Sequence, residues 1–119
     1  IEFKDPWVRA APPVARVMAG YGTLHNPQAT ALRIESLSSP AFERVELHEM
    51  SMAGGVMKMR RRDPYTLGAG QDLVLEPGGW HLMLVGPRSP QAEGTTVTVR
   101  ISTDQGTHEF ALPVRKPAP

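Results

Sequence analysis

The sequence predicts an all-β domain, an antiparallel β-sandwich with Greek-key or hairpin links, and three observations lead to this fold class. Short β-like runs begin about every ten residues, with proline, glycine and other turn residues between them. No segment carries an apolar stripe at spacings of three and four over three turns, as a surface helix would. Parallel strands need long crossover connections, and the short spacing leaves no room for them. The length of 119 residues fits one domain.

The candidate strands are short runs rich in apolar residues, bounded by turn residues. In chain order they are Trp7–Arg9, Gly20–His25, Thr30–Ser36, Arg44–His48, Gly55–Arg60, Asp72–Glu76, Trp80–Val85, Thr95–Ser102 and His108–Leu112. The second of them ends at the turn signal Asn26-Pro27. In the eighth, Val97, Val99 and Ile101 alternate with polar residues and should face the core.

The two ends of the chain are expected to lie outside the domain. Residues 1–5 resemble a tail or a remnant of cloning, and residues 114–119 contain prolines and basic side chains typical of an extended tail. The domain is therefore expected to span residues 6–113, with no internal repeat and no second domain.

Composition excludes several classes of function. The formal net charge of +1 gives no bulk electrostatic argument for nucleic acid. The absence of cysteine excludes disulfides and thiolate chemistry. No apolar run approaches the roughly 20 residues of a membrane helix, and no signal peptide is visible. No nucleophile elbow, phosphate-binding glycine loop or paired-carboxylate motif is present, so the chain is not expected to be an enzyme.

Methionine and histidine gather in one stretch of the chain. Six methionines are present, and five of them lie between positions 50 and 83. His81 and Met83 stand at i and i+2 of an expected strand, so they share one face while Leu82 and Leu84 turn to the core. By the same alternation His48 should lie opposite the core-facing Val45 and Leu47.

An antiparallel neighbour could bring a methionine beside His48. Met57 and Met59 both fit, because strand alternation puts them on the same face. Neutral thioethers are soft ligands that favour Cu(I), whereas zinc sites use thiolate, imidazole and carboxylate. No loop offers the oxygen cage of a hard cation, and blue copper needs a cysteine. The residues therefore indicate a Cu(I) site with two histidines and two methionines.

The spacing of these residues resembles the signature of the periplasmic copper chaperones of the PCu(A)C family, formerly a domain of unknown function. That signature is histidine, ten residues, methionine, twenty-one residues, then His-x-Met. His48, Met59, His81 and Met83 match it without a gap. The segments Trp7–Ala10, 45–50 and 75–84 also resemble the family.

The resemblance implies a cupredoxin-like β-sandwich and selects Met59 over Met57 as the fourth ligand. It implies a periplasmic or otherwise extracytoplasmic monomer that binds copper ion as Cu(I). It also implies delivery to cytochrome oxidase assembly, at the Cu(A) site of subunit II, beside a Sco-type partner. Because histidine must be neutral to coordinate, Cu(I) affinity should fall below about pH 6.5.

One alternative interpretation fits the same residues. The methionines could form an adaptable docking surface of a metal-free β-sandwich that binds another protein, since flexible thioethers suit such surfaces. His25 and His108 lie outside the signature and are expected to be structural. Met50, Met52 and Met57 could line the approach to the site or form a weak second position, although core packing and surface exposure are the simpler roles.

Overall fold

The computed structural model describes residues 1–117, and every regular element among them is a β-strand. The strands are β1 (Glu2–Arg9), β2 (Val17–His25), β3 (Leu32–Ser38), β4 (Phe42–Ala53), β5 (Val56–Arg61), β6 (Tyr65–Leu67), β7 (Asp72–Leu75), β8 (Trp80–Pro87), β9 (Thr96–Thr103) and β10 (Gly106–Arg115). The all-β class and the single domain are confirmed. No helix in this part of the chain has the length and apolarity to cross a membrane.

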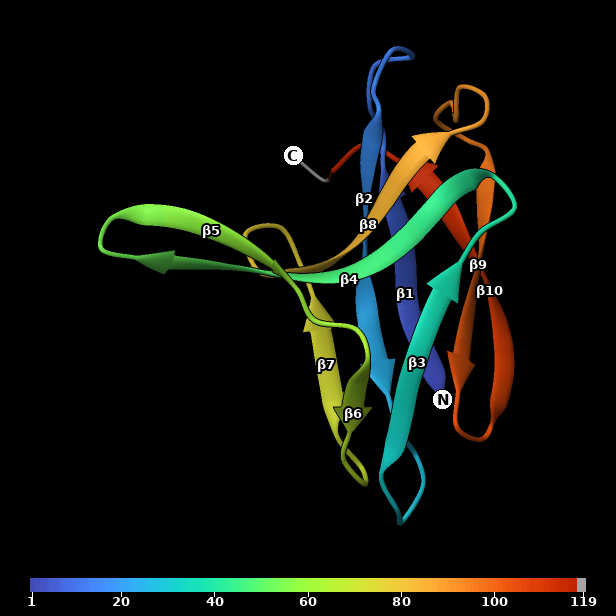
Figure 1. Ribbon diagram of the computed structural model, residues 1–119. Coiled ribbons are helices and arrows are strands. Elements are labelled where there is room, and N and C mark those ends of the chain that lie inside the picture. The colour runs from blue at the N-terminus through green and yellow to red at the C-terminus, as the bar shows by residue number, and fades with distance from the viewer. Residues whose placement is uncertain (118–119) are drawn as a thin grey trace.

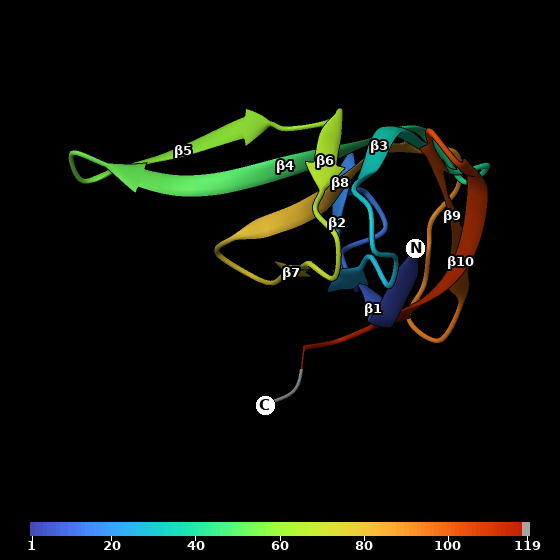
Figure 2. The same ribbon diagram turned by 90° about the horizontal axis from the view of Figure 1, so that it is seen from below.

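The strands form one sheet that folds over and closes on itself (Figures 1 and 2). Its order is β5-β4-β8-β7-β2-β1-β10-β9-β3-β6, with additional pairings of β4 with β3 and of β8 with β2. The pairing of β4 with β3 closes the ring, because it joins two strands from opposite ends of that order. Within the sheet β4 and β8 pair directly and antiparallel, and these two strands carry both histidines of the signature.

The core lies inside the folded sheet and is made of alternating residues from most strands. Val97, Val99 and Ile101 on β9 are fully buried, as their alternation predicted, and Leu82 and Leu84 on β8 are buried with them. Inward-facing branched and aromatic side chains stabilise strands by burying apolar area, at roughly 25 cal/mol per Å².

The expected antiparallel arrangement is wrong for two pairs. β1 pairs with β10 in parallel, through Val8 with Val114, and β7 meets β8 in parallel at Leu75 and Trp80. The first pair joins the first strand to the last, so the whole domain serves as its connection and no crossover helix is needed. The more detailed cupredoxin-like Greek-key arrangement stays a prediction.

Both expected tails need correction. β1 begins at Glu2, and Phe3 packs into the core, edge-on to Phe110 with ring centroids 5.6 Å apart. At the other end, β10 continues to Arg115 with Val114 buried. Both segments are held in the sheet by pairing with other strands, residues 2–4 with β2 and residues 114–115 with β1. Residues 118–119 of the expected C-terminal tail lie outside the described residues.

The short strand β6 was not expected from the sequence. It pairs antiparallel with β3. Asn26, which is fully buried, adds side-chain hydrogen bonds by donating its amide to Thr30 O, Leu67 O and Gly68 O. The Asn26 side-chain oxygen accepts the N–H of Gln28, which makes the turn that Asn26-Pro27 predicted.

Strands β4 and β5 form a hairpin that projects from the body of the domain (Figures 1 and 2). Its turn is Gly54-Gly55, with φ of 59° and 78°. Two central residues with positive φ are typical of a type I′ turn, whose twist matches that of the paired strands. This turn fixes the register Met52↔Met57 and Met50↔Met59.

Candidate metal site

The register of β4 and β8 places the two histidines of the signature beside each other. His48 pairs with His81, and their ring centroids lie 5.9 Å apart. Met83, two residues along β8, pairs with Glu46, so its side chain extends from the same face. The sorting by alternation is therefore confirmed, with Leu82 and Leu84 in the core and the polar or soft side chains on the other face.

The hairpin brings methionines to this same face. Met59 on β5 stands opposite Met50 on β4, and Met50 follows His48 by two residues. Met57 lies one step further from the body, opposite Met52. Both candidates left open by alternation are thus on the correct face, and Met59 is nearer to the histidines.

A cavity of about 210 Å³ lies between β2, β8 and the hairpin. Met59, His81 and Met83 line it, together with Met50 and Tyr21. Three of the four residues of the signature therefore face one space, and the fourth, His48, lies directly beside His81. Met50 is a fifth residue of suitable chemistry, and its place after His48 in the same strand, at i+2, was the sequence signal for it.

His81 is buried and has one ring nitrogen committed to the backbone. Its exposed fraction is 6%, and Nδ1 lies 3.1 Å from the carbonyl oxygen of Gly79. A carbonyl only accepts, so Nδ1 carries the proton and Nε2 keeps a free lone pair. Burial lowers the pKa of His81, the bond to Gly79 opposes this, and the nearby His48 adds to the lowering. The ring is therefore held in the neutral form that metals require.

His48 is oriented by a carboxylate. Its Nε2 lies 2.8 Å from Oε1 of Glu46. The hydrogen bond with His48 is the main cause that lowers the pKa of Glu46; burial opposes it, while Arg61 and Arg44 add to it. An ionised carboxylate only accepts, so Nε2 of His48 donates and Nδ1 is left as an acceptor.

Nδ1 of His48 is buried and has no hydrogen-bond partner anywhere in residues 1–117. Buried polar atoms are nearly always hydrogen-bonded, so an unpaired imidazole nitrogen at this position is unusual. A metal ion would satisfy it, and a carboxylate on the far nitrogen is the usual support of a metal-bound histidine. The residues present therefore fit a soft cation held by imidazole and thioether.

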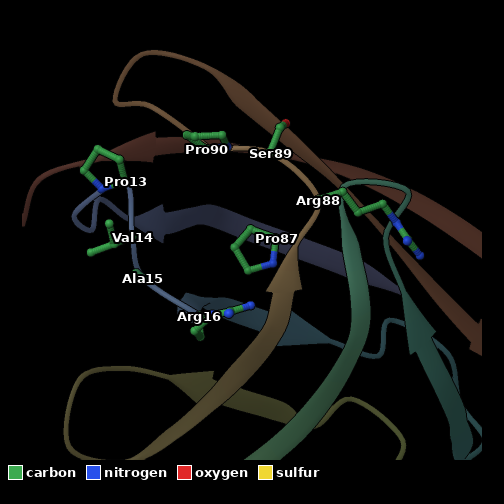
Figure 3. Close-up of a pocket in the computed structure, with 8 residues that line it drawn as sticks. All are labelled: Pro13, Val14, Ala15, Arg16, Pro87, Arg88, Ser89 and Pro90. Carbon is green, nitrogen blue, oxygen red and sulfur yellow. The ribbon is translucent and has the colours of Figure 1, made fainter.

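Other parts of the described structure are less suited to bind a metal ion. Within the described residues, no group of three or more His, Cys, Asp or Glu side chains could hold a metal ion. A larger hollow of about 380 Å³ lies at the end of the domain between residues 13–16 and 87–90 (Figure 3). Its lining contains prolines and two arginines but neither histidine nor methionine. His25 is bound to Asp72, which agrees with a structural role.

A comparison with known protein families assigns the chain to one of them. The model of the family described as "Putative lipoprotein LpqE-like" matches residues 1–114. The chain belongs to this family. The LpqE-like family is the PCu(A)C family, so the resemblance drawn from the His/Met spacing is confirmed.

Two curated relatives of this LpqE-like domain match most of its length. The putative lipoprotein Lxx21020 of Leifsonia xyli subsp. xyli is 28% identical over 97% of this chain and 69% of its own length. The uncharacterized protein RP573 of Rickettsia prowazekii is 25% identical over 92% of this chain. The chain spans 63% of the length of that second relative.

Solved structures of similar fold include copper-bound domains. The copper-bound PCuAC domain from PmoF2 has a TM-score of 0.79 over 97% of this chain and 92% of its own; at 21% identity it shows the fold alone. The CuI-bound solution structure of DR1885 from Deinococcus radiodurans is 29% identical, with a TM-score of 0.71 over 98% of this chain and 80% of that one. The apo form of DR1885 is 30% identical, with a TM-score of 0.69 over 94% of this chain and 76% of that one.

Proposed function

We propose that this domain is an extracytoplasmic copper carrier that binds Cu(I) through His48, Met59, His81 and Met83. The observation that carries the proposal is the pair of adjacent imidazoles, each with one nitrogen committed and the other free, beside a cavity lined by thioethers. Thioethers select Cu(I) over zinc and hard cations. Copper bound to DR1885, a relative of 29% identity, supports the same cargo here.

The proposal extends to delivery rather than catalysis. An all-neutral ligand set leaves the positive charge on the ion, so the ion can pass to an acceptor by stepwise ligand exchange. Met59 is 45% exposed, which makes it the ligand an acceptor would replace first. The resemblance names the acceptor as the Cu(A) site of cytochrome oxidase subunit II, with a Sco-type partner, and the carrier as a monomer of cupredoxin-like fold. Relatives named as lipoproteins support a place outside the cytoplasm.

The first experiment is an anaerobic Cu(I) titration against a chromophoric chelator, comparing the parent with His81→Ala and Met83→Ala. We expect one tightly bound Cu(I) in the parent and at least a tenfold weaker one in either variant, in line with the loss of a direct ligand. His108→Ala is the matched control, because that histidine lies on β10, outside the site. A parent that does not compete with the chelator would overturn the proposal.

The second candidate is a metal-free interaction module. It is favoured by the exposed apolar side chains on the projecting hairpin, where Met52 is 67%, Val56 57% and Met57 50% exposed. In that case the parent would not bind Cu(I), and His81→Ala would leave the binding of a protein partner unchanged.

A further inference from the structure

The hairpin carries more thioethers than the proposed copper site uses. Met50, Met52 and Met57 are left when Met59 is assigned to that site. Their positions follow from the register, in which Met52 stands opposite Met57, and Met50 opposite Met59. Cross-strand partners and residues two apart share a face, so all four methionines lie on the face that carries His48.

The pairing geometry brings these side chains as close as a sheet allows. Met50 donates its N–H to the carbonyl of Gly79, on the side away from β5. The pair Met50↔Met59 is therefore not joined by backbone hydrogen bonds, and alternation gives Met52↔Met57 the same character. Such pairs have Cα atoms roughly 4.5 Å apart, with side chains closer than in the hydrogen-bonded pairs.

Met50 can join the outer pair. It precedes Met52 by two residues on β4 and is diagonal to Met57, at a Cβ separation of roughly 7–8 Å that long side chains bridge. Methionine has three rotatable bonds beyond its backbone and adapts readily to such a span. Three thioether sulfurs can therefore converge above this face.

Core packing does not explain these methionines. Met52 and Met57 are 67% and 50% exposed, and every residue of β5 is exposed. The opposite face of the same hairpin carries no methionine: Glu49 pairs with Arg60, Ser51 with Lys58, and Ala53 with Val56 next to the turn. Thioethers are thus confined to the face that leads toward the cavity, where Met50 and Met59 are already part of the lining.

We infer that Met50, Met52 and Met57 form a second Cu(I) site, made of thioethers alone, on the hairpin beside the main cavity, which Met50 also lines. It rests on the proposed function only in taking Cu(I) as the cargo. Three neutral thioethers without imidazole make a weaker site than the two-histidine set, and the exposure of Met52 and Met57 opens it to solvent. The ion can then move inward by exchanging Met52 and Met57 for Met59 and the residues of the cavity, with no change of oxidation state.

The experiment uses Ag(I) as a redox-inert Cu(I) analogue and follows the methionine methyl groups by NMR in protein labelled at those carbons. In the parent, the first equivalent should shift the methyl signals of Met59 and Met83, and the second those of Met52 and Met57. The variant Met52→Leu/Met57→Leu keeps the apolar bulk but removes the sulfurs. It should lose the second equivalent while the first keeps its affinity within about twofold, as expected for separable sites. Lys58→Gln, on the opposite face of the hairpin, is the control and should behave as the parent.

The outcomes separate this inference from the proposed function. If the first equivalent binds and the Met52 and Met57 signals stay unchanged at excess Ag(I), the second site does not exist. The same conclusion follows if the double leucine variant still takes up a second equivalent. If Met59 and Met83 stay unchanged while Met52 and Met57 shift, the thioether site stands and the main site fails.

Discussion

At the residue scale, one carboxylate governs the chemistry of His48. Glu46 accepts from Nε2 of His48 and is itself held by Arg44 and Arg61, with 3.1 Å and 3.3 Å between the paired atoms. Glu46 therefore fixes both the tautomer and the direction of the imidazole, and Nδ1 is the nitrogen left for a ligand. Residue scale is also where the sequence was most informative, because soft ligand type and strand alternation are local properties.

We predict that Glu46→Gln weakens Cu(I) binding by about 10- to 100-fold, the usual effect of losing support to a metal-bound histidine. A glutamine amide can donate to the ring and so permits the other tautomer, in which Nδ1 carries the proton. The measurement is competitive Cu(I) titration, with the ¹⁵N shifts of the His48 ring in the apo protein as the readout of tautomer. Glu109→Gln, in the ion pair with Arg100, is the control. Unchanged ring shifts in Glu46→Gln would contradict the orienting role.

The candidate metal ligands could be predicted from the sequence, but the residues that orient these ligands could not. His81 and Met83 are two residues apart, so alternation alone put them on one face. Choosing Met59 over Met57 requires the register of the hairpin, because both methionines alternate onto the same face. Glu46 shares the parity of His48, but its hydrogen bond to His48 and its ion pair with Arg61 from the neighbouring strand are visible only in the folded structure.

At the scale of elements, the β4–β5 hairpin depends on its two-glycine turn. Both glycines have positive φ, and a Cβ added at either meets no atom within 4 Å, so the cost of alanine is purely conformational. That cost is about 1–2 kcal/mol per residue in the left-handed region.

We predict that Gly54→Ala/Gly55→Ala loosens the hairpin and weakens Cu(I) binding, because Met59 lies on β5, an edge strand that pairs with β4. Global unfolding should be affected less than the hairpin, because β5 buries no side chain and the hairpin can loosen while the core stays folded. Hydrogen exchange of the amides in residues 49–60 should accelerate, and the Cu(I) titration should report a weaker site. Gly70→Ala, with φ of 68° and similar open space, is the control and should leave both unchanged. Unaltered exchange in the hairpin would argue against this role of the turn.

The base of the same hairpin is fastened by Asp63. Its carboxylate accepts the N–H of Leu47 at 2.8 Å and the guanidinium of Arg61 at 3.0 Å, and its side chain is only 3% exposed. Burial acts to raise the pKa of Asp63, but the hydrogen bonds from Arg61 and Leu47 outweigh it and the pKa is lowered. A lowered carboxyl pKa stabilises the fold above the unfolded value of about 3.9, and this contribution is lost as the pH falls through the folded value.

We predict that Asp63→Asn reduces the free energy of unfolding by about 1–3 kcal/mol at pH 7, the range for a hydrogen bond to a charged group. As the pH falls from 7 through the lowered pKa of Asp63, the parent carboxyl becomes protonated and the difference should shrink. Urea unfolding at a series of increasingly acidic pH values measures this. Asp104→Asn is the control, since Asp104 also accepts a backbone N–H, from Arg33, but has no ion pair among the described residues. A difference that stays constant with pH would contradict the assigned charge.

Strand positions were largely predictable, and the exceptions have physical causes. Runs such as Thr95–Ser102 carry their own alternation and need no partner to be recognised. β6 is three residues long; it pairs with β3, and its last carbonyl, Leu67 O, accepts from Asn26, about forty positions earlier in the chain. A hydrogen bond between such distant segments leaves no periodic pattern in either.

At the scale of the whole molecule, the closed sheet joins the first strand to the last. β1 lies between β2 and β10, in the middle of the strand order, and pairs with the last strand in parallel. The sequence could not predict this pairing, because no local pattern marks two strands that meet in parallel from the ends of a domain. The same non-local contact explains why residues 1–5 looked like a tail although they contain a core residue.

We predict that Phe3→Ala lowers the free energy of unfolding by about 3 kcal/mol, the lower end of the range for deleting a buried phenylalanine. The lower end applies because Phe3 lies at the margin of the core, 9% exposed, and its edge-on contact is with the partly buried Phe110. The urea unfolding transition should remain a single cooperative one, because the buried residues of the closed sheet form one core cluster. Urea unfolding of the apo protein tests both statements, with Glu2→Ala on the exposed face as a control expected within about 0.5 kcal/mol of the parent. The folded variant should still bind Cu(I) as the parent does, because β4, β5 and β8 carry the site. A Phe3→Ala protein as stable as the Glu2→Ala control would restore the reading of residues 1–5 as a tail.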